Sequence, residues 1–554
     1  MTQSFNEEKM GRKYDILRKK EEEESAVLFA QKFGLPYADI STFPIDIDAI
    51  KIIPEESARA GFLAAFQITG KHLKIALRNP EKEETAALLT SLGVAHYICD
   101  LYVVSEHGLE RAWSYYKKVP KENEARTGIR VEEEKMQALQ KEIIDLASLK
   151  TKIEEGFGGA TSSILELVLA GALALNTSDV HVEPQPEEVR LRFRLDGVLH
   201  DVAFIPKKVY ALLLSRIKLI SELKLNVHDR AQDGRFTIHT SLGDIEVRTS
   251  ILPGPDGENS VLRILNPKAI EITFAELGMH PAVEKIMDAE LSRPNGMILT
   301  TGPTGSGKTT ALYAFLKKIH SPEIKIITLE DPIEYHLKGI EQSQVDIEKG
   351  YTFAEGLRAI VRQDPDVILV GEIRDFETAE TAVNAALTGH LVFSTLHTNN
   401  AAGAIPRFIN LGVKPASIAP SLNVTMAQRL VRKLCTGCRV SVTQDAEWKK
   451  KLEGELATFP KSFPVPEPSQ WTVFEVKKKG CEKCNSTGYK GRIGVFEIIL
   501  VTPEIEKLIL RSPSEYEIQL EATRQGHITM RQDGVLKILA GVTDFSEIER
   551  VVGK

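Results

Sequence analysis

A glycine-rich segment near the middle of the chain carries the residue types that bind a triphosphate. The run from 302 to 310 reads Gly-Pro-Thr-Gly-Ser-Gly-Lys-Thr-Thr and matches the P-loop pattern G-x-x-x-x-G-K-[ST] at every fixed position. In this pattern backbone N–H groups turn toward phosphates, Lys308 reaches the β and γ oxygens, and the Thr309 hydroxyl ligates Mg²⁺. The residues expected to contact the nucleotide are Gly302, Pro303, Thr304, Gly305, Ser306, Gly307, Lys308, Thr309 and Thr310.

The segments around this loop fit its chemistry. The apolar run 297–301 predicts a buried strand, and the run 310–318 predicts the helix that follows. A glycine-rich loop between a strand and a helix is the context that a P-loop requires, so the sequence predicts a site for ATP within an α/β domain.

Two acidic clusters follow predicted strands farther along the chain. Glu330 comes directly after the strand 325–329, and Glu372 follows the strand 366–370. Because ligands of open α/β sheets bind at the carboxyl ends of the strands, both acids are expected near the P-loop. We expect Glu330 to act as the general base and Glu372 to hold Mg²⁺, with the reverse assignment left open.

Other polar residues near these strands have different expected roles. Asp331, Glu334 and Asp375 suit surface positions or helix caps. His390 and His397 flank the strand 391–395, where a polar side chain at a strand end could contact the γ-phosphate.

Four of the five cysteines form two C-x-x-C pairs. Cys435 and Cys438 make the first pair, and Cys481 and Cys484 make the second. Four thiolates at this spacing close a tetrahedral structural Zn²⁺ site, which we favour over redox pairs. The segment 444–470 between the pairs is expected to project from this module as a loop.

Bulk properties restrict the class of protein. The chain has 554 residues and a formal net charge of −7, and neither half is strongly basic, which argues against direct nucleic-acid binding. The N-terminus is polar and unlike a signal peptide, and the apolar stretch 164–175 is too short for a membrane span. These features predict a cytoplasmic protein.

The pattern along the chain predicts four regions. An α+β domain covers 1–118, a charged and partly helical linker 119–157, a second α+β domain 158–267, and the ATPase domain 268–554. Within the last region, the cysteine module spans about 430–498 and is followed by C-terminal helices. In the second domain, the alternating segments 189–195 and 198–202 around Asp196-Gly197 predict a β-hairpin.

Together these motifs resemble the secretion ATPase superfamily, and more narrowly its type IV pilus assembly and type II secretion ATPases. The P-loop, Leu329-Glu-Asp-Pro-Ile-Glu-Tyr335, Gly371-Glu-Ile-Arg-Asp375 and Ser394-Thr-Leu-His-Thr398 look like the family's Walker A, Asp box, Walker B and His box. Further similarity lies in Ser178-Asp-Val-His-Val-Glu183, Arg192-Phe-Arg-Leu-Asp-Gly197, Gln232-Asp-Gly-Arg235, Ala427-Gln-Arg-Leu-Val-Arg432 and the cysteine quartet.

The resemblance implies a hexameric ring with ATP between a PAS-like N2 domain and a RecA-like core. It also implies an inner-membrane platform protein as partner, reached through the N-terminal domain and the ring face, and peripheral membrane association. Arginines of such sites stabilise charge on the transferred phosphoryl group. The matching positions are Arg248, Arg263, Arg358, Arg362 and Arg492.

Several functions remain open at this level. An assembly motor for type IV pili is favoured over a type II secretion ATPase, a nucleotide-responsive scaffold with little turnover, and a nucleic-acid translocase. Cyclic di-GMP binding, which occurs in some relatives, is not expected, because the segment 15–21 lacks the glycines of that motif.

Overall fold

The computed structural model describes residues 21–553, apart from 42, 44, 70, 95–96, 119–127, 130–138, 140–141, 159–160, 241–242, 268–270, 443–444 and 478. The chain divides into two compact units, Met1–Thr127 and Gly128–Lys554.

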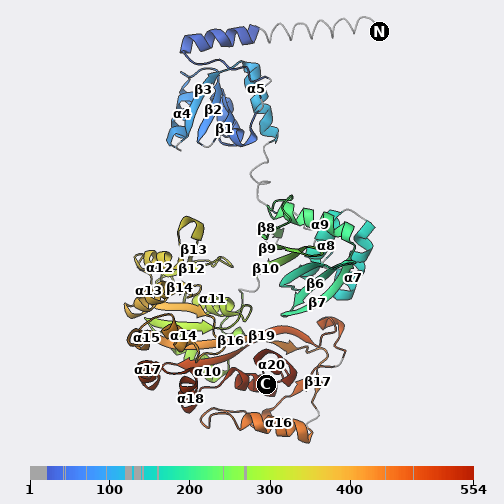
Figure 1. Cartoon of the computed structure of the whole chain (residues 1–554), viewed down its shortest axis with the longest axis vertical. Coiled ribbons are helices and arrows are strands. Elements are labelled where there is room, and N and C mark those ends of the chain that lie inside the picture. The colour runs from blue at the N-terminus through green and yellow to red at the C-terminus, as the bar shows by residue number, and fades with distance from the viewer. Residues whose placement is uncertain are drawn as a thin grey trace. The chain divides into compact units, whose positions relative to one another are not determined.

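The first unit is built on a three-stranded sheet in the order β1-β2-β3, flanked by helices α4 and α5 (Figure 1). Strand β2 pairs antiparallel with β1 and parallel with β3. The bounds are α2 Ile47–Lys51, α3 Glu55–Ala60, β1 Leu63–Thr69, β2 His72–Leu77, α4 Glu83–Val94, β3 Ile98–Val103 and α5 Glu106–Ser114. The unit has its own core and the predicted α+β character.

The second unit begins with a seven-stranded sheet in the order β4-β8-β9-β10-β5-β6-β7. Helices α7, α8 and α9 pack on it around one apolar cluster (Figure 1). The bounds are β4 Gly128–Ile129, α7 Leu146–Glu155, α8 Thr161–Ala174, β5 Asp179–Pro184, β6 Val189–Leu195, β7 Val198–Ile205, α9 Lys207–Ile220, β8 Gln232–Thr240, β9 Gly243–Gly254 and β10 Gly257–Leu265.

The predicted hairpin of this domain is confirmed as β6 and β7. Along β6 the apolar residues are buried and the arginines between them are partly exposed, because side chains of a strand alternate between its two faces. Asp196 and Gly197 both have positive φ, at 47° and 84°, as a two-residue type I′ turn requires.

The predicted linker 119–157 contains two parts. Positions 119–127, 130–138 and 140–141 lie outside the described residues. Helix α7, at the end of that range, buries Leu149 and Ile153 in the same cluster as α8 and the sheet. The last turns of the predicted linker therefore belong to the core of the second domain.

The ATPase domain is built on a second seven-stranded sheet in the order β13-β12-β14-β15-β11-β16-β19. Its pairings are parallel except that β16 and β19 run antiparallel. The bounds are β11 Gly296–Thr301, β12 Ile326–Glu330, β13 Glu341–Gln344, β14 Val367–Val370, β15 Leu391–Leu396, β16 Leu422–Leu434 and β19 Tyr489–Leu500. Strands β11, β12, β14 and β15 are buried at every position, which explains their mostly apolar sequences.

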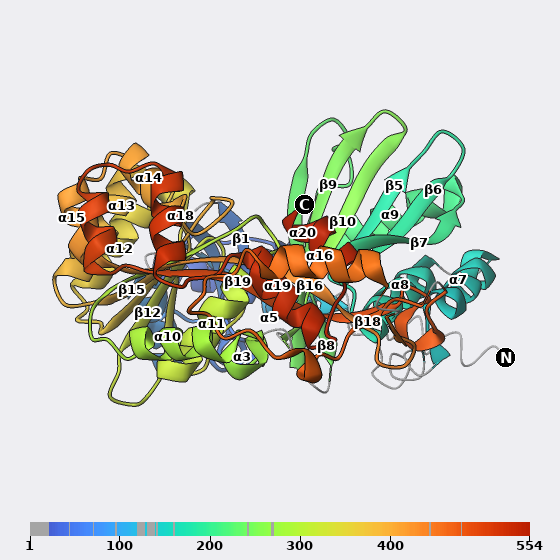
Figure 2. The same cartoon turned by 90° about the horizontal axis from the view of Figure 1, so that it is seen from below.

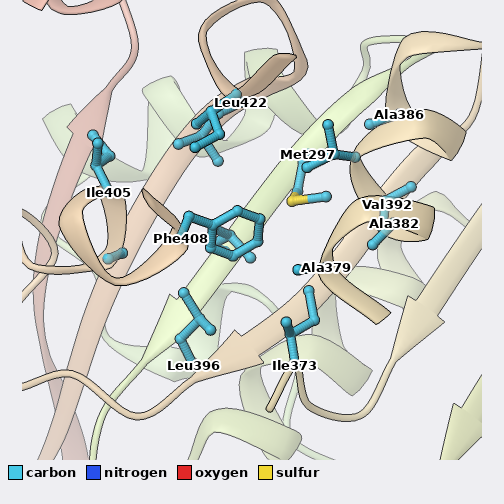
Figure 3. Close-up of a cluster of buried hydrophobic side chains, with 14 of the residues drawn as sticks. Met297, Ile373, Ala379, Ala382, Ala386, Val392, Leu396, Ile405, Phe408 and Leu422 are labelled. Atoms are coloured by element: carbon cyan, nitrogen blue, oxygen red, sulfur yellow. The ribbon is translucent and has the colours of Figure 1, made fainter. Parts of the chain in front are cut away.

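Helices cover both faces of this sheet (Figure 2). Helices α10 and α11 lie on one face, and α12 to α15 with α18 lie on the other. The core of the second face joins Met297 of β11 to Phe408 of α14 and Ala382 of α13 (Figure 3). The bounds are α10 Pro281–Leu291, α11 Lys308–Ile319, α12 Phe353–Val361, α13 Phe376–Leu387, α14 Ala404–Asn410, α15 Pro415–Ser421, α17 Pro503–Ile509 and α18 Glu515–Arg524.

The segment between the two cysteine pairs corrects the expectation of a projecting loop. It forms helix α16, whose Leu452 is buried in a cluster with Val535 and Ile538 of α19. The remaining bounds are α16 Ala446–Leu456, β17 Val440–Ser441, β18 Phe474–Glu475, α19 Met530–Leu539 and α20 Phe545–Val552. The high lysine and glutamate content suggested an exposed loop. An amphipathic helix, however, needs few apolar residues to anchor it.

Across the described part of the chain, every helix is too short or too polar to cross a bilayer. The apolar stretch 164–175 lies almost entirely in α8, whose apolar residues are buried in the second domain.

Candidate active site

The P-loop joins β11 to α11 as predicted. Gly302, Gly305 and Gly307 have φ values of 149°, 78° and 89°, a region that side chains with a Cβ rarely adopt. Gly307 is the N-cap of α11, and no side chain caps that helix end. Its first N–H groups are therefore available to an anion, and the helix dipole favours negative charge there.

Lys308 lies over this loop. Its Nζ donates to the carbonyls of Gly302 at 2.7 Å and Pro303 at 3.1 Å. Burial lowers the pKa of Lys308, and the nearby Arg429 lowers it further, while Glu372 acts in the opposite direction. A positive lysine in a partly buried, cationic loop is arranged to bind a polyanion.

One further observation fits a phosphate chain. The Oγ of Ser306 is buried and has no hydrogen-bond partner among the described residues. A buried hydroxyl without a partner is costly, and a phosphate oxygen would satisfy it. The loop therefore fits the triphosphate that its sequence predicts.

Glu330 occupies the last position of β12 and is almost fully buried. Its Oε1 accepts hydrogen bonds from Thr328 Oγ1 at 2.6 Å and from Gln342 Nε2 at 3.1 Å. Its Oε2 accepts from the hydroxyl of Tyr313 at 2.5 Å. The carboxylate is therefore held by residues of β12, β13 and α11.

Glu372 lies just after β14. Its carboxylate pairs with Arg374 at 2.5 Å and with Nε2 of His397 at 3.3 Å. It also lies close enough to Lys308 to influence its pKa. The structure thus brings three of the predicted site residues, Glu372, His397 and Lys308, into one neighbourhood.

The two candidate histidines separate in the fold. His397 follows β15 at the P-loop edge, but His390 precedes β15 and its carbonyl accepts from Gly296 at the start of β11. Because the strands are parallel, His390 lies at the opposite edge of the sheet from the loop. The expectation that His390 contacts a phosphate is wrong. Asp375 accepts from Thr378 N and caps α13, which confirms its expected structural role.

The five candidate arginines have different surroundings. Arg248 of β9 donates to the carbonyl of Ile333, within the Asp-box segment that follows Glu330, at 2.8 Å. Arg263 of β10 donates to Asp179 of β5 at 3.0 Å. Among the described residues, only Arg248 of the five donates a hydrogen bond to the segments around the P-loop.

The other three arginines lie farther along the ATPase domain. Arg358 of α12 pairs with Glu377 of α13. Arg362 follows the last turn of α12, and Arg492 lies opposite Arg432 in the pairing of β16 with β19. Within one chain these three side chains are not gathered around Lys308.

Sequence reasoning missed residues on the strand beside the P-loop. Strand β16 pairs with β11, so that Ala427 lies opposite Thr301 and the next two residues extend under the loop. A Cβ on Gly302 would meet the carbonyl of Gln428 at 2.7 Å and Nη1 of Arg429 at 3.0 Å. The family-like segment 427–432 contains both residues, but only the strand pairing shows that they support the loop.

The four cysteines converge at the other end of β16 and β19. Their sulfur atoms all lie within 4.8 Å of one another. Cys435 and Cys481 are 3.8 Å apart, Cys438 and Cys484 are 3.8 Å apart, and Cys481 and Cys484 are 3.7 Å apart. Zinc–sulfur bonds of about 2.3 Å in a tetrahedron require sulfur separations of about 3.8 Å, so the arrangement fits that ion.

Backbone groups support negative charge on one of these sulfurs. The N–H groups of Cys481 and Gly488 donate to Cys484 Sγ at 3.1 and 3.2 Å. Burial acts to raise the pKa of the Cys484 thiol, but these bonds outweigh it and lower the pKa to about 7. A thiolate is the form that binds a metal ion.

Comparison with known proteins identifies the family. The family described as Type II/IV secretion system protein matches residues 156–550, and the MshEN domain matches residues 33–122. The chain belongs to the Type II/IV secretion system protein family. It is accordingly a P-loop ATPase of the secretion and pilus-assembly class.

Individual relatives support this placement. The Type IV pilus assembly ATPase PilB of Myxococcus xanthus (strain DK1622) is 34% identical over 537 residues, which are 95% of this chain and 91% of the relative. Type II secretion system protein E of Klebsiella pneumoniae is 42% identical over 388 residues, which are 70% of this chain and 75% of the relative. The X-ray structure of the Yersinia pseudotuberculosis ATPase DotB has a TM-score of 0.51 and 19% identity, and covers 71% of this chain and 93% of that chain. At 19% identity, the similarity to DotB shows only that the two proteins share a fold.

Proposed function

We propose that this chain is a motor ATPase that powers type IV pilus assembly by driving an inner-membrane platform protein. The supporting observation is the extent of its similarity to the Myxococcus xanthus pilus ATPase, which covers 95% of the chain. The similarity to the Klebsiella pneumoniae secretion protein covers 70%. A type II secretion ATPase is the second candidate, since that relative has the higher identity.

The proposed reaction is hydrolysis of the γ-phosphoryl group of ATP. Glu330 accepts a proton from water as the water oxygen attacks the γ-phosphorus, and the β–γ bridging oxygen leaves on ADP with the bonding electron pair. Lys308 and the N–H groups at the start of α11 stabilise the negative charge on the phosphate oxygens. His397, beside Glu372, is proposed to contact the region of the γ-phosphate.

Thr309 and Glu372 are the residues proposed to hold Mg²⁺, which would supply positive charge to the triphosphate. Cys435, Cys438, Cys481 and Cys484 are proposed to hold Zn²⁺ in a closed structural site, because four sulfurs at tetrahedral separations fill its coordination. The zinc site stabilises the module and takes no part in the chemistry.

We propose a homo-hexamer as the working form. Arg248 and Arg263 are proposed to stabilise charge from the second domain. Arg358, Arg362 and Arg492, which are not gathered around Lys308 within one chain, are proposed to serve such a site from a neighbouring subunit. Arg248 has the most direct support, because its guanidinium already holds the segment after Glu330 through the Ile333 carbonyl.

The N-terminal unit and the ring face are proposed to dock on the platform protein, so that the chain works in the cytoplasm at the inner face of the membrane without binding nucleic acid. Domain limits at 118 and 267 remain part of this proposal, whereas the second domain begins before 157, because α7 packs in its core. The prediction against cyclic di-GMP remains a prediction. It rests on the segment 15–21, of which 15–20 lie outside the described residues. This segment also precedes the MshEN match, which covers 33–122.

Phosphate release by the purified chain tests the proposed chemistry. Lys308→Ala, Glu330→Gln and Glu372→Gln are each expected to lower turnover by at least 100-fold. Glu330→Gln should keep the Mg²⁺ dependence of ATP binding, whereas Glu372→Gln should require more Mg²⁺. Lys449→Ala, at an exposed position of α16, is the control and should hydrolyse ATP at the wild-type rate. Equal and negligible rates for the wild type and Glu330→Gln would favour a scaffold, and stimulation of turnover by DNA would favour a translocase.

Complementation of a gene deletion tests the cellular role. We expect the deletion to abolish surface pili. The wild-type gene should restore them, and the gene for Lys308→Ala should not. Normal pili with loss of exported proteins would favour type II secretion instead.

A further inference from the structure

Tyr313 links the P-loop helix to the proposed base. It lies in α11, five positions after Lys308, and its side chain is fully buried. Its hydroxyl donates to Oε2 of Glu330 at 2.5 Å. One end of this contact therefore belongs to the helix that binds the triphosphate, and the other belongs to the carboxylate at the end of β12.

The bonds around Glu330 are divided unequally between its two oxygens. A carboxylate offers about four acceptor positions, two on each oxygen. Thr328 and Gln342 both donate to Oε1, whereas among the described residues Tyr313 alone donates to Oε2. The remaining acceptor position is therefore on Oε2, next to the tyrosine hydroxyl, and a water proton can be accepted there.

The hydroxyl of Tyr313 is also fixed in direction. Burial raises the pKa of Tyr313, and the negative charge of Glu330 raises it further, so the phenol keeps its proton. The protonated phenol therefore donates to Glu330 Oε2, which lies 2.5 Å away.

Packing alone does not require a hydroxyl at this position. Phe315, two residues farther along α11, is equally buried and fills the same apolar cluster. Burying a hydroxyl is unfavourable unless it finds a partner, and here the partner is a carboxylate at the site. The polar atom of Tyr313 thus serves the carboxylate and adds nothing to the apolar contacts.

We propose that Tyr313 is a positioning residue that fixes which lone pair of Glu330 faces the attacking water. This inference rests on the proposed role of Glu330 as general base. It makes the orientation of the base depend on the helix that begins at Lys308. A carboxylate turned away from the attacking water loses turnover while ATP binding by the loop is retained.

The test uses the purified full chain and four variants: Tyr313→Phe, Glu330→Gln, the double variant, and Tyr351→Phe. Tyr351→Phe is the matched control, because it removes a tyrosine hydroxyl that contacts Ser343 on the neighbouring β13 and leaves Glu330 untouched. Phosphate release at varied ATP concentration gives kcat and KM, and thermal melting reports folding. We expect Tyr313→Phe to lower kcat about ten-fold with KM within two-fold of wild type. The control should retain the wild-type kcat.

The double variant separates positioning from general damage. If Tyr313 acts through Glu330, the Tyr313→Phe change has no further effect on the residual rate of Glu330→Gln. Three results would overturn the inference about Tyr313 but leave the role of Glu330 intact. These are a wild-type kcat for Tyr313→Phe, an equal loss of kcat from Tyr313→Phe in the wild-type and the Glu330→Gln chains, and a Tyr313→Phe chain that does not fold at 20 °C. Wild-type turnover of Glu330→Gln would instead overturn the assignment of the base, and the inference with it.

Discussion

Arg432 of β16 and Glu547 of α20 form a two-pronged ion pair in which Nε and Nη2 of the arginine both donate to Glu547 Oε2, at 3.0 and 2.7 Å. Arg550 and the backbone N–H of Arg432 also donate to this carboxylate, which is fully buried. The last helix of the chain is thereby fixed to the strand that precedes the cysteines.

Glu547→Gln is expected to destabilise the fold, by about 3 kcal/mol, because two guanidinium groups lose their buried counter-charge. Burial acts to raise the pKa of Glu547, but the bonds from Arg550 and Arg432 outweigh it and the pKa is lowered. A lowered pKa in the folded state means stability that is present above the unfolded value of about 4.5 and is lost as the pH falls. The difference in melting temperature between wild type and variant should therefore be large at pH 7 and narrow below pH 4.5; a constant difference would contradict the assignment.

Glu497 on β19 should show the opposite dependence. It is nearly fully buried, and burial raises its pKa. A raised pKa favours the protonated form in the folded state, so the folded protein loses stability relative to the unfolded chain as the pH rises above about 4.5. Glu497→Gln mimics the neutral form and can still accept from Ala401 N. We expect its melting temperature to exceed that of wild type by a few degrees at pH 7 and to match it near pH 4.

Gly302→Ala is expected to abolish ATP binding, because the new methyl group would meet the Gln428 carbonyl and Ser306 Oγ, each at 2.7 Å, and φ is 149°. Binding of a fluorescent ATP analogue measures the effect. The control is Gly454→Ala in α16, where a Cβ meets nothing within 4 Å, and helix propensity should stabilise that variant by up to about 1 kcal/mol. Wild-type affinity of Gly302→Ala would show that the loop relaxes more than its packing indicates.

Elemental analysis checks the metal site. The wild-type chain should carry one zinc ion, and Cys484→Ser should carry much less and melt at a lower temperature. Cys99→Ser is the control, since Cys99 lies outside the cluster and should leave the metal content unchanged. Full zinc content in Cys484→Ser would rule out a closed site of four sulfurs.

Local patterns predicted the strands of the ATPase sheet, the P-loop and the hairpin of the second domain, because continuous apolar runs, glycine spacing and an Asp-Gly turn act over a few residues. Which strands lie next to each other depends on the order of strands in the sheet, and local patterns do not predict that order. Strand β16 follows β15 in the chain but pairs with β11, so no local pattern indicates that Arg429 lies under Gly302.

The same limit applies to the proposed base. Glu330 was found because it ends a strand, but its partner Tyr313 lies in a helix 17 positions earlier in the chain. The tyrosine is indistinguishable by pattern from the apolar residues around it. Only packing of α11 against β12 reveals what its hydroxyl contacts.

The antiparallel ladder of β16 and β19 has a mechanical consequence. The first half of β16 pairs with β11, its middle residues Gln428 and Arg429 lie under the P-loop, and its last residue is followed directly by Cys435. A displacement at the cysteines would thus be carried to Gln428 along one strand, whose pairing with β19 is irregular between Arg432 and Leu434.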